Sequence, residues 1–264
     1  MSTLRTVCRH LSATAVLQVA ELRTPPIAAS LSFKTHDGDA VQTAHWDDAK
    51  GVATCSLAPW RTFRWRYGQR HYSGTYWSAT MQDHVIYESR LELTRLIYAD
   101  FGPEVTSIVA QPFLIEAVVD GERRRRIPDY LLLTSTGPVV VDVKPMVRTA
   151  APKVSYALKW TRELIEELGW SYEVWTEPPP IELANLRFLA GYRDERRMNA
   201  GVVEKLRGSE IDGLSIQQAI QSCDGWPQPL AHAGVCHLLW RGAIHTDLSA
   251  TLQSSSVLRK VPNS

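Results

Sequence analysis

Two aspartates and a lysine stand beside aliphatic runs in the stretch RRRRIPDYLLLTSTGPVVVDVKP, residues 123–145. Asp129 precedes the run YLLLT, whereas Asp142 and Lys144 follow VVV and are two residues apart. Side chains two apart on a strand point to the same face, so Asp142 and Lys144 are expected to project together. A short STGP connection predicts two antiparallel neighbouring strands, which places Asp129 near Asp142.

Two carboxylates that converge on one point repel each other unless a cation lies between them. Hard oxygen ligands of this kind suit Mg²⁺, for which Mn²⁺ substitutes. Such a metal generates a nucleophilic water and clamps a phosphate, and a nearby lysine can position that water or stabilise negative charge in the transition state. Glu92, on a predicted upstream helix, offers a third carboxylate. The structural alternative is a hairpin that carries a solvated Asp–Lys ladder.

The segments around these residues predict a compact α/β core. Apolar spacing indicates an amphipathic helix over 87–102 and a second helix over 154–170. Runs of β-branched and aliphatic residues between turn sequences predict strands. These strands cover residues 108–119, 127–134, 138–144 and 171–177.

A helical glutamate, then PD, then a hairpin that ends in hydrophobic-D-x-K is the pattern of the PD-(D/E)xK nuclease core. More narrowly, SRLELTRLIYADFGPEVTSIVAQPF, IPDYLL and VVVDVKP resemble the TnsA endonuclease subunit of heteromeric, Tn7-type transposases. The resemblance covers roughly residues 60–180 and extends loosely to the C-terminal region. It implies a restriction-endonuclease-like α/β core, a mixed sheet flanked by helices, with a C-terminal winged-helix-like domain.

Matching the motifs position by position assigns roles to four residues. The resemblance makes Glu92 the helical catalytic glutamate, Asp129 the metal-binding aspartate and Lys144 the catalytic lysine. Asp142 stands where the family carries a glutamine or an acid, which completes a catalytic set of four and a metal-binding set of Glu92, Asp129 and Asp142. Gln111 matches a family glutamine, for which a structural hydrogen bond is the default role.

The resemblance also implies an activity and partners. TnsA-like proteins are Mg²⁺-dependent endonucleases that cleave the 5′ strands of double-stranded DNA at transposon ends, while a DDE-type transposase processes the 3′ ends. The C-terminal domain is implicated in contacts with the transposase and with an ATP-dependent transposition regulator. Two alternatives stay open: a standalone nuclease in repair or defence against foreign DNA, and a catalytically inactive DNA-binding assembly protein. The complete set of four residues argues against the inactive alternative.

Three domains are predicted along the chain. Residues 1–59 form an N-terminal extension of unclear role, residues 60–178 the nuclease domain, and residues 179–264 the winged-helix-like domain. The proline-rich EPPP, residues 177–180, marks the second boundary.

A basic and aromatic stretch, residues 60–77, interleaves arginines with Phe, Trp and Tyr. Such a surface binds phosphates through its cations and stacks bases on its rings. It predicts DNA contacts through Arg61, Arg64, Arg66 and Arg70. The alternative is that the rings face the core and the arginines are solvated.

The composition is that of an ordinary globular chain, with 264 residues, 44% hydrophobic and 22% charged. A net charge of +1 means that DNA affinity must come from local patches. Four scattered cysteines without a CxxC pair argue against a zinc site or a disulfide framework and favour a reducing, cytoplasmic setting. No apolar run approaches the roughly 20 residues that span a bilayer, so no membrane association is expected.

Overall fold

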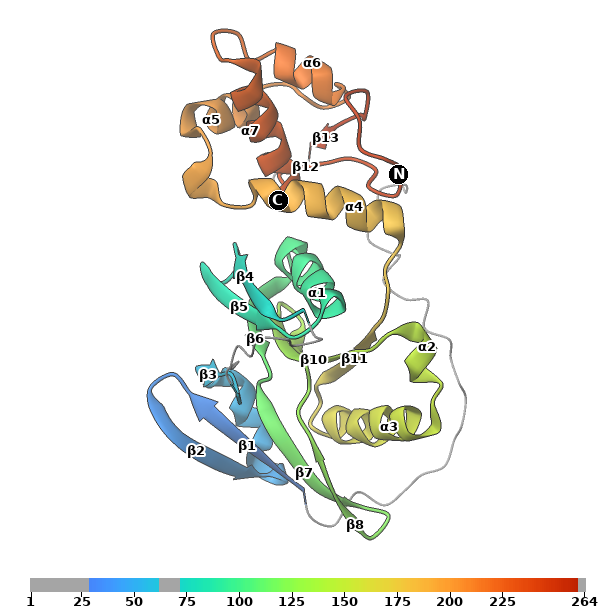
Figure 1. Ribbon diagram of the computed structural model, residues 1–264. Helices are drawn as coiled ribbons and strands as arrows, with labels where there is room; N and C mark the ends of the chain where they lie inside the picture. The colour runs from blue at the N-terminus through green and yellow to red at the C-terminus, as the bar shows by residue number, and fades with distance from the viewer. Residues whose placement is uncertain (1–28, 62–71, 261–264) are drawn as a thin grey trace, which may run out of the picture.

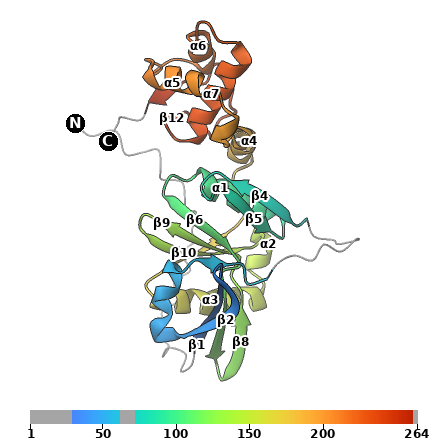
Figure 2. The same cartoon turned by 90° about the vertical axis from the view of Figure 1, so that its left-hand side faces the viewer.

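The computed structural model describes residues 29–61 and 72–260 of the chain. It is a mixed α/β protein in which two main sheets occupy one end and helices α4 to α7 the other (Figures 1 and 2). The strands are β1 Ala29–Thr35, β2 Gly38–His45, β3 Leu57–Ala58, β4 Gly74–Ser78, β5 Asp83–Tyr87, β6 Val105–Ala110, β7 Phe113–Val119, β8 Glu122–Arg126, β9 Tyr130–Thr134, β10 Gly137–Val143, β11 Ser171–Trp175, β12 Ile244–His245 and β13 Arg259–Lys260. The helices are α1 Arg90–Phe101, α2 Met146–Thr149, α3 Pro152–Glu167, α4 Pro180–Leu189, α5 Ala200–Gly208, α6 Ile216–Gln221 and α7 Gln228–Trp240, with short 3₁₀ helices at Trp46–Thr54, Ala190–Tyr192 and Glu195–Arg197.

The central sheet has the strand order β11-β10-β9-β6. Strand β10 is antiparallel to β9 and parallel to β11, and α3 supplies the long crossover that a parallel pair requires. Successive residues of β10 pack on opposite faces. Val140 belongs to the apolar cluster of α3, whereas Val141 and Val143 belong to the cluster of α1. The face that carries Val140 therefore also carries Asp142.

The second sheet, β2-β1-β7-β8, contains part of the predicted N-terminal extension. Strand β1 pairs antiparallel with β7, from Ala29 opposite Ala117 to Phe33 opposite Phe113. The predicted boundary at residue 59 therefore does not separate two packing units, because residues on both sides of it share one sheet and one apolar cluster.

One predicted strand, residues 108–119, is divided into β6 and β7 at Gln111 and Pro112. Proline has no N–H for a ladder hydrogen bond, and Gln111 has a φ of 46°, which turns the chain out of the first strand. Strand β8, the arginine run, follows β7 through the two-residue turn Asp120-Gly121 and was not among the predicted strands. The chain thus moves from one sheet to the other at Gln111.

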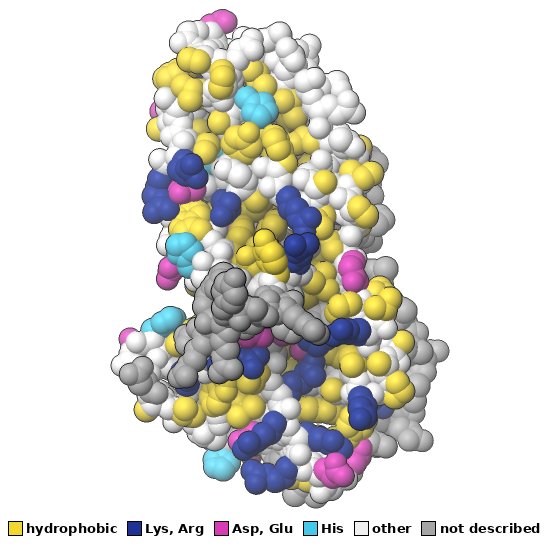
Figure 3. Space-filling model, viewed as in Figure 1, with side chains coloured by type: hydrophobic (Ala, Val, Ile, Leu, Met, Phe, Trp, Pro, Cys, Tyr) yellow, Lys and Arg dark blue, Asp and Glu magenta, His cyan; other side chains and the backbone are white. Residues whose placement is uncertain are grey.

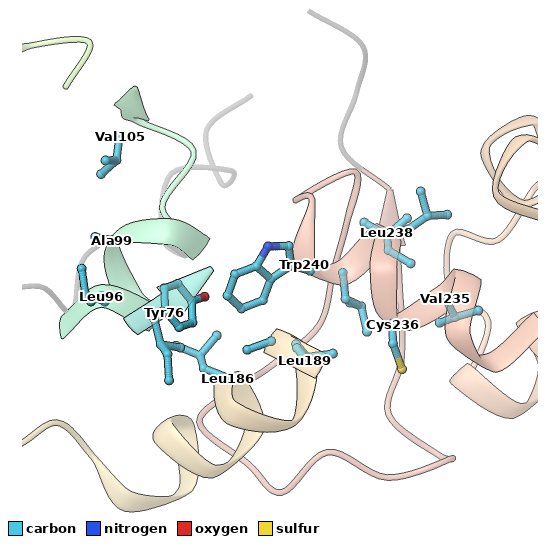
Figure 4. Packing of buried hydrophobic residues seen from close by; sticks show 14 of the residues in the cluster. Tyr76, Leu96, Ala99, Val105, Leu186, Leu189, Val235, Cys236, Leu238 and Trp240 are labelled. Atoms are coloured by element: carbon cyan, nitrogen blue, oxygen red, sulfur yellow. The ribbon is translucent and has the colours of Figure 1, made fainter. Parts of the chain in front are cut away.

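Helices α4 to α7 and the short pair β12–β13 follow the predicted boundary at EPPP. Figure 4 shows Trp240 of α7 beside Tyr76 of β4 and Leu189 of α4, which belong to the same apolar cluster. The rings of Phe101, at the end of α1, and Trp240 lie 5.4 Å apart. Leu186 and Leu189 of α4 belong to the same apolar cluster as Leu96 of α1. This end of the molecule therefore shares a hydrophobic core with the α1 face of the central sheet.

The described rings of the basic and aromatic stretch divide, because Tyr72 is 60% exposed whereas the rings on β4 lie against the protein. Tyr76 on β4 is buried in the core, and Arg193 and Arg196 stack their guanidinium groups over the ring of Trp77. Of the four predicted DNA contacts only Arg61 is described. Arg64, Arg66 and Arg70 lie outside the described residues.

In the ranges 29–61 and 72–260 no helix is long and apolar enough to cross a membrane. Cys55, Cys223 and Cys236, the cysteines in those ranges, are free thiols.

Candidate active site

The ends of β9 and β10 bring three oxygen atoms around the ammonium group of Lys144. Its Nζ lies 3.0 Å from Oδ2 of Asp129, 2.9 Å from the carbonyl oxygen of Val143 and 4.0 Å from Oδ1 of Asp142. The antiparallel β9–β10 pair and the two-residue spacing on β10 produce this arrangement. Asp129, Asp142 and Lys144 are therefore brought together, in the way that their positions on the hairpin predict.

Asp129 is fixed by hydrogen bonds to the backbone of β10 and of the turn between β6 and β7. Its Oδ2 accepts a 2.6 Å hydrogen bond from the backbone N–H of Val143, and its carbonyl accepts one of 2.8 Å from the N–H of Gln111. Desolvation raises the pKa of the Asp129 carboxyl, the Lys144 ammonium opposes this, and the charge of Asp142 adds to the increase. A second positive charge beside Asp129 would relieve both unfavourable effects.

Asp142 is buried, with 1% of its side chain exposed. The guanidinium of Arg126 contacts both of its oxygens, with Nε at 3.0 Å from Oδ2 and Nη2 at 2.7 Å from Oδ1. The hydroxyl of Tyr172 donates to Oδ2. Oδ1 makes this ion pair but no hydrogen bond of normal geometry. One oxygen of Asp142 is thus held firmly, and the other, near Lys144, is less well satisfied.

Arg126 and Tyr172 are functional candidates that the sequence analysis missed. Tyr172 pairs in register with Val140, two residues before Asp142, so strand alternation places it on the face of Asp142. A search of neighbouring strands for same-face partners of Asp142 would have found it. Arg126 has no comparable signal, because one arginine in a run of four looks like the others.

Glu92 lies in the first turn of α1 and takes part in the cap of that helix. Ser89 is the N-cap residue, and the Glu92 carboxylate accepts hydrogen bonds from the Ser89 hydroxyl at 2.9 Å and the Glu88 backbone N–H at 2.7 Å. Burial, followed by the charge of Asp129, raises the pKa of Glu92 to about 7. The charge of Asp129 therefore disfavours the ionised form of Glu92, and the Glu92 carboxyl gains or loses its proton near neutral pH.

Gln111 connects the loop around Arg61 to the site. It is a buried residue with a positive φ, a conformation that costs a non-glycine residue roughly 1 kcal/mol or more. Its side-chain oxygen accepts a 3.0 Å hydrogen bond from Arg61, whose guanidinium also lies 3.0 Å from the carboxylate of Glu88. The predicted structural hydrogen bond of Gln111 is present, and it holds Arg61 beside the N-terminus of α1.

The donor set of the site fits a hard divalent cation in type, because carboxylate and carbonyl oxygens already surround one positive charge. Asp129 and Asp142 would hold such an ion. In the described ranges no three His, Cys, Asp or Glu side chains form a ready metal-binding cluster. The part of Glu92 as a third ligand stays a prediction.

Comparison with known proteins adds no family assignment. No protein-family model matches the chain, and no curated protein matches it.

Proposed function

We propose that this protein is a Mg²⁺-dependent endodeoxyribonuclease that hydrolyses phosphodiester bonds in double-stranded DNA. The observation that supports this most directly is the convergence of Asp129, Asp142 and Lys144, with 3.0 Å and 4.0 Å between the ammonium and the two carboxylates. The motif resemblance supports the more specific role of a TnsA-like subunit that cleaves the 5′ strands at transposon ends.

The roles of the side chains follow from their surroundings. Bound Mg²⁺ would supply a water of lowered pKa and a positive charge for the phosphate. Asp129 and Asp142 provide oxygen ligands, and Arg126 and Tyr172 fix the orientation of Asp142. Lys144, which is 28% exposed, presents its ammonium to an entering phosphate and stabilises the negative charge that develops during attack. Glu92, with a pKa of about 7, accepts or releases a proton at its carboxylate.

The partners in this proposal are a DDE-type transposase and an ATP-dependent regulator. A winged-helix-like domain in the C-terminal region would contact them. The order helix α7, strand β12, strand β13 is compatible with such a domain.

The test is cleavage of supercoiled plasmid DNA that carries the transposon ends, with Mg²⁺ and the partner transposase. Lys144→Ala removes the ammonium but leaves both aspartates, so we expect cleavage to fall by on the order of 100-fold or more while the protein still folds. Lys159→Ala, which changes an exposed lysine on α3, is the matched control and should cleave normally. Cleavage by Lys144→Ala at the wild-type rate would refute the nuclease proposal.

Calorimetry with Mn²⁺ tests the ligands separately. We expect Asp129→Ala to lose Mn²⁺ binding and Lys144→Ala to keep it, and equal affinity of Asp129→Ala and the wild type would exclude this metal site. Cleavage of plasmid that lacks the ends, without the transposase, would identify a standalone nuclease instead.

A further inference from the structure

A groove of about 630 Å³ lies between β8 and the beginning of α3. Its polar lining is cationic, and Figure 3 shows Lys and Arg side chains on the lower part of the molecule, where β8 and α3 lie in Figure 1. Arg124, Arg125 and Arg126 line it from β8, and Lys153 and Tyr156 line it from α3.

The groove carries more positive than negative charge. Its arginines pair with carboxylates, Arg124 with Glu122 at 2.6 Å and Arg125 with Glu116 at 2.6 Å, while Arg126 pairs with Asp142. Each of these pairs uses only some of the five N–H groups of a guanidinium. The Nε of Arg124 is buried without a hydrogen-bond partner.

Lys153 adds a cation at the other wall of the groove. It is exposed, and among the described residues it forms no hydrogen bond or ion pair. The first turn of α3, where it lies, contains no acidic residue that would repel an anion. A phosphate in the groove would therefore meet unused donors from β8 and an unpaired ammonium from α3.

Arg126 connects the groove to the candidate active site. Its guanidinium lines the groove and contacts both oxygens of Asp142, whose Oδ1 lies 4.0 Å from the ammonium of Lys144. Both the groove and Asp142 are on the α3 face of the central sheet. A DNA strand in the groove would thus be separated from the carboxylate of Asp142 by one side chain, that of Arg126.

We propose that this groove binds the phosphodiester backbone of duplex DNA beside the scissile bond, with Arg124 and Lys153 as the phosphate contacts. The inference rests on the proposed function and specifies where the substrate lies. The ring of Tyr156 favours backbone recognition over stacking of single-stranded bases. The guanidinium of Arg124 lies over one face of the ring, and the hydroxyl donates to Asp120 at 2.6 Å, so that face is already in use and is not open to a base.

The experiment is a titration of a short fluorescent duplex of mixed sequence with the full chain at several salt concentrations, with EDTA present to prevent cleavage. Lys153→Gln and Arg124→Gln are compared with Lys159→Gln. Like Lys153→Gln, this control removes one positive charge from α3, but at a position outside the groove. For each groove variant we expect affinity to fall on the order of 10-fold at low salt and the salt slope to fall by about one. The control should match the wild type.

The outcomes separate this inference from the proposed function. Groove variants that bind duplex DNA with the wild-type affinity and salt slope overturn the groove, whatever the cleavage assay shows. A wild-type chain that does not bind the duplex at low salt also overturns it. Tighter binding of a single strand than of the duplex, with loss in the groove variants, overturns the choice of duplex. Loss of binding in the groove variants of a chain that never cleaves supports the groove and counts against the nuclease.

Discussion

Two buried aspartates in this protein are satisfied in opposite ways. Asp100 on α1 is 6% exposed, and its carboxylate accepts hydrogen bonds from four neutral groups of the described chain, two hydroxyls and two backbone N–H groups. These donors are Tyr76, Ser78, Ala79 and Thr80, at 2.6 to 3.0 Å. Asp142 is buried more deeply, but its closest partners are the cation of Arg126 and the hydroxyl of Tyr172, and the cation of Lys144 lies nearby.

The difference distinguishes a structural carboxylate, that of Asp100, from a candidate catalytic one, that of Asp142. Four fixed neutral donors fill the lone pairs of Asp100, so it ties the β4–β5 hairpin to α1 and has no capacity left for a ligand. Asp142 keeps one oxygen without a normal hydrogen bond, next to the partly exposed Lys144. Burial by itself therefore does not distinguish the two carboxylates, whereas the kind of partner makes Asp142 the candidate for a functional role.

The largest expected effect is the loss of the cation beside Asp142. Arg126→Met leaves a buried carboxylate without its counter-charge, and we expect the free energy of unfolding to fall by about 3 to 5 kcal/mol. Adding Asp142→Asn should restore more than half of that loss, because the remaining pair is neutral. Urea unfolding measures both. Arg125→Met, which breaks an exposed pair with Glu116, is the control and should cost at most about 1 kcal/mol. If the double variant loses as much stability as the two single variants together, Arg126 is not the counter-charge of Asp142.

A somewhat smaller effect is expected at Asp100. Asp100→Asn keeps the shape but turns one acceptor into an NH₂ group that faces two donors, so about 2 to 4 kcal/mol should be lost. Thermal unfolding by circular dichroism measures this change. Asp83→Asn, on the exposed end of the same hairpin, should change stability by no more than about 0.5 kcal/mol. In contrast to the Arg126–Asp142 pair, no single substitution of one of the four donors should restore the stability that Asp100→Asn loses. A rescue by Tyr76→Phe of most of the loss would contradict the view of a four-donor network.

The smallest effect concerns Glu92 and depends on pH. Its carboxyl has a pKa of about 7 in the folded chain against 4.5 as the ordinary value, so between these values the folded protein binds more protons than the unfolded one. The free energy of unfolding therefore falls as pH rises from 4.5 to 7, by about 1 to 3 kcal/mol. Glu92→Gln keeps the helix cap but does not titrate. Its stability relative to the wild type should rise across this window in EDTA-containing buffer. Parallel stability curves for the two proteins would show that Glu92 is not perturbed.

Local sequence patterns predict where the central residues of the candidate site lie, but they do not predict the partners that come from other strands. The positions of Asp129, Asp142 and Lys144 follow from a tight hairpin and an alternation of two residues, which are local properties of the chain. Arg126 ends β8 in the second sheet and reaches Asp142 on β10 of the central sheet, and Tyr172 reaches it after the α3 crossover. Neither relation is present in the spacing of one segment.

For a similar reason, the sequence does not show which face of the strand in the aromatic stretch is buried. Alternation on β4 distinguishes its two faces but does not say which one is buried. Tyr76 faces inward because Asp100 and the apolar residues of α1 lie there. The split of the predicted strand 108–119 also needed tertiary information, because a positive φ at Gln111 is stabilised only by its contacts.

The pairing of β1 with β7 has a consequence for how the chain reaches its folded state. β1 can form a local hairpin with β2 at once, and β3 pairs with its last two residues, but β7, which pairs with Ala29–Phe33, begins only at Phe113. Closing so long a loop carries an entropic cost and slows folding. While the ribosome is still making the intervening residues, the free edge of β1 is open to pairing with other chains. Docking of β7 then closes this edge and protects the chain against aggregation.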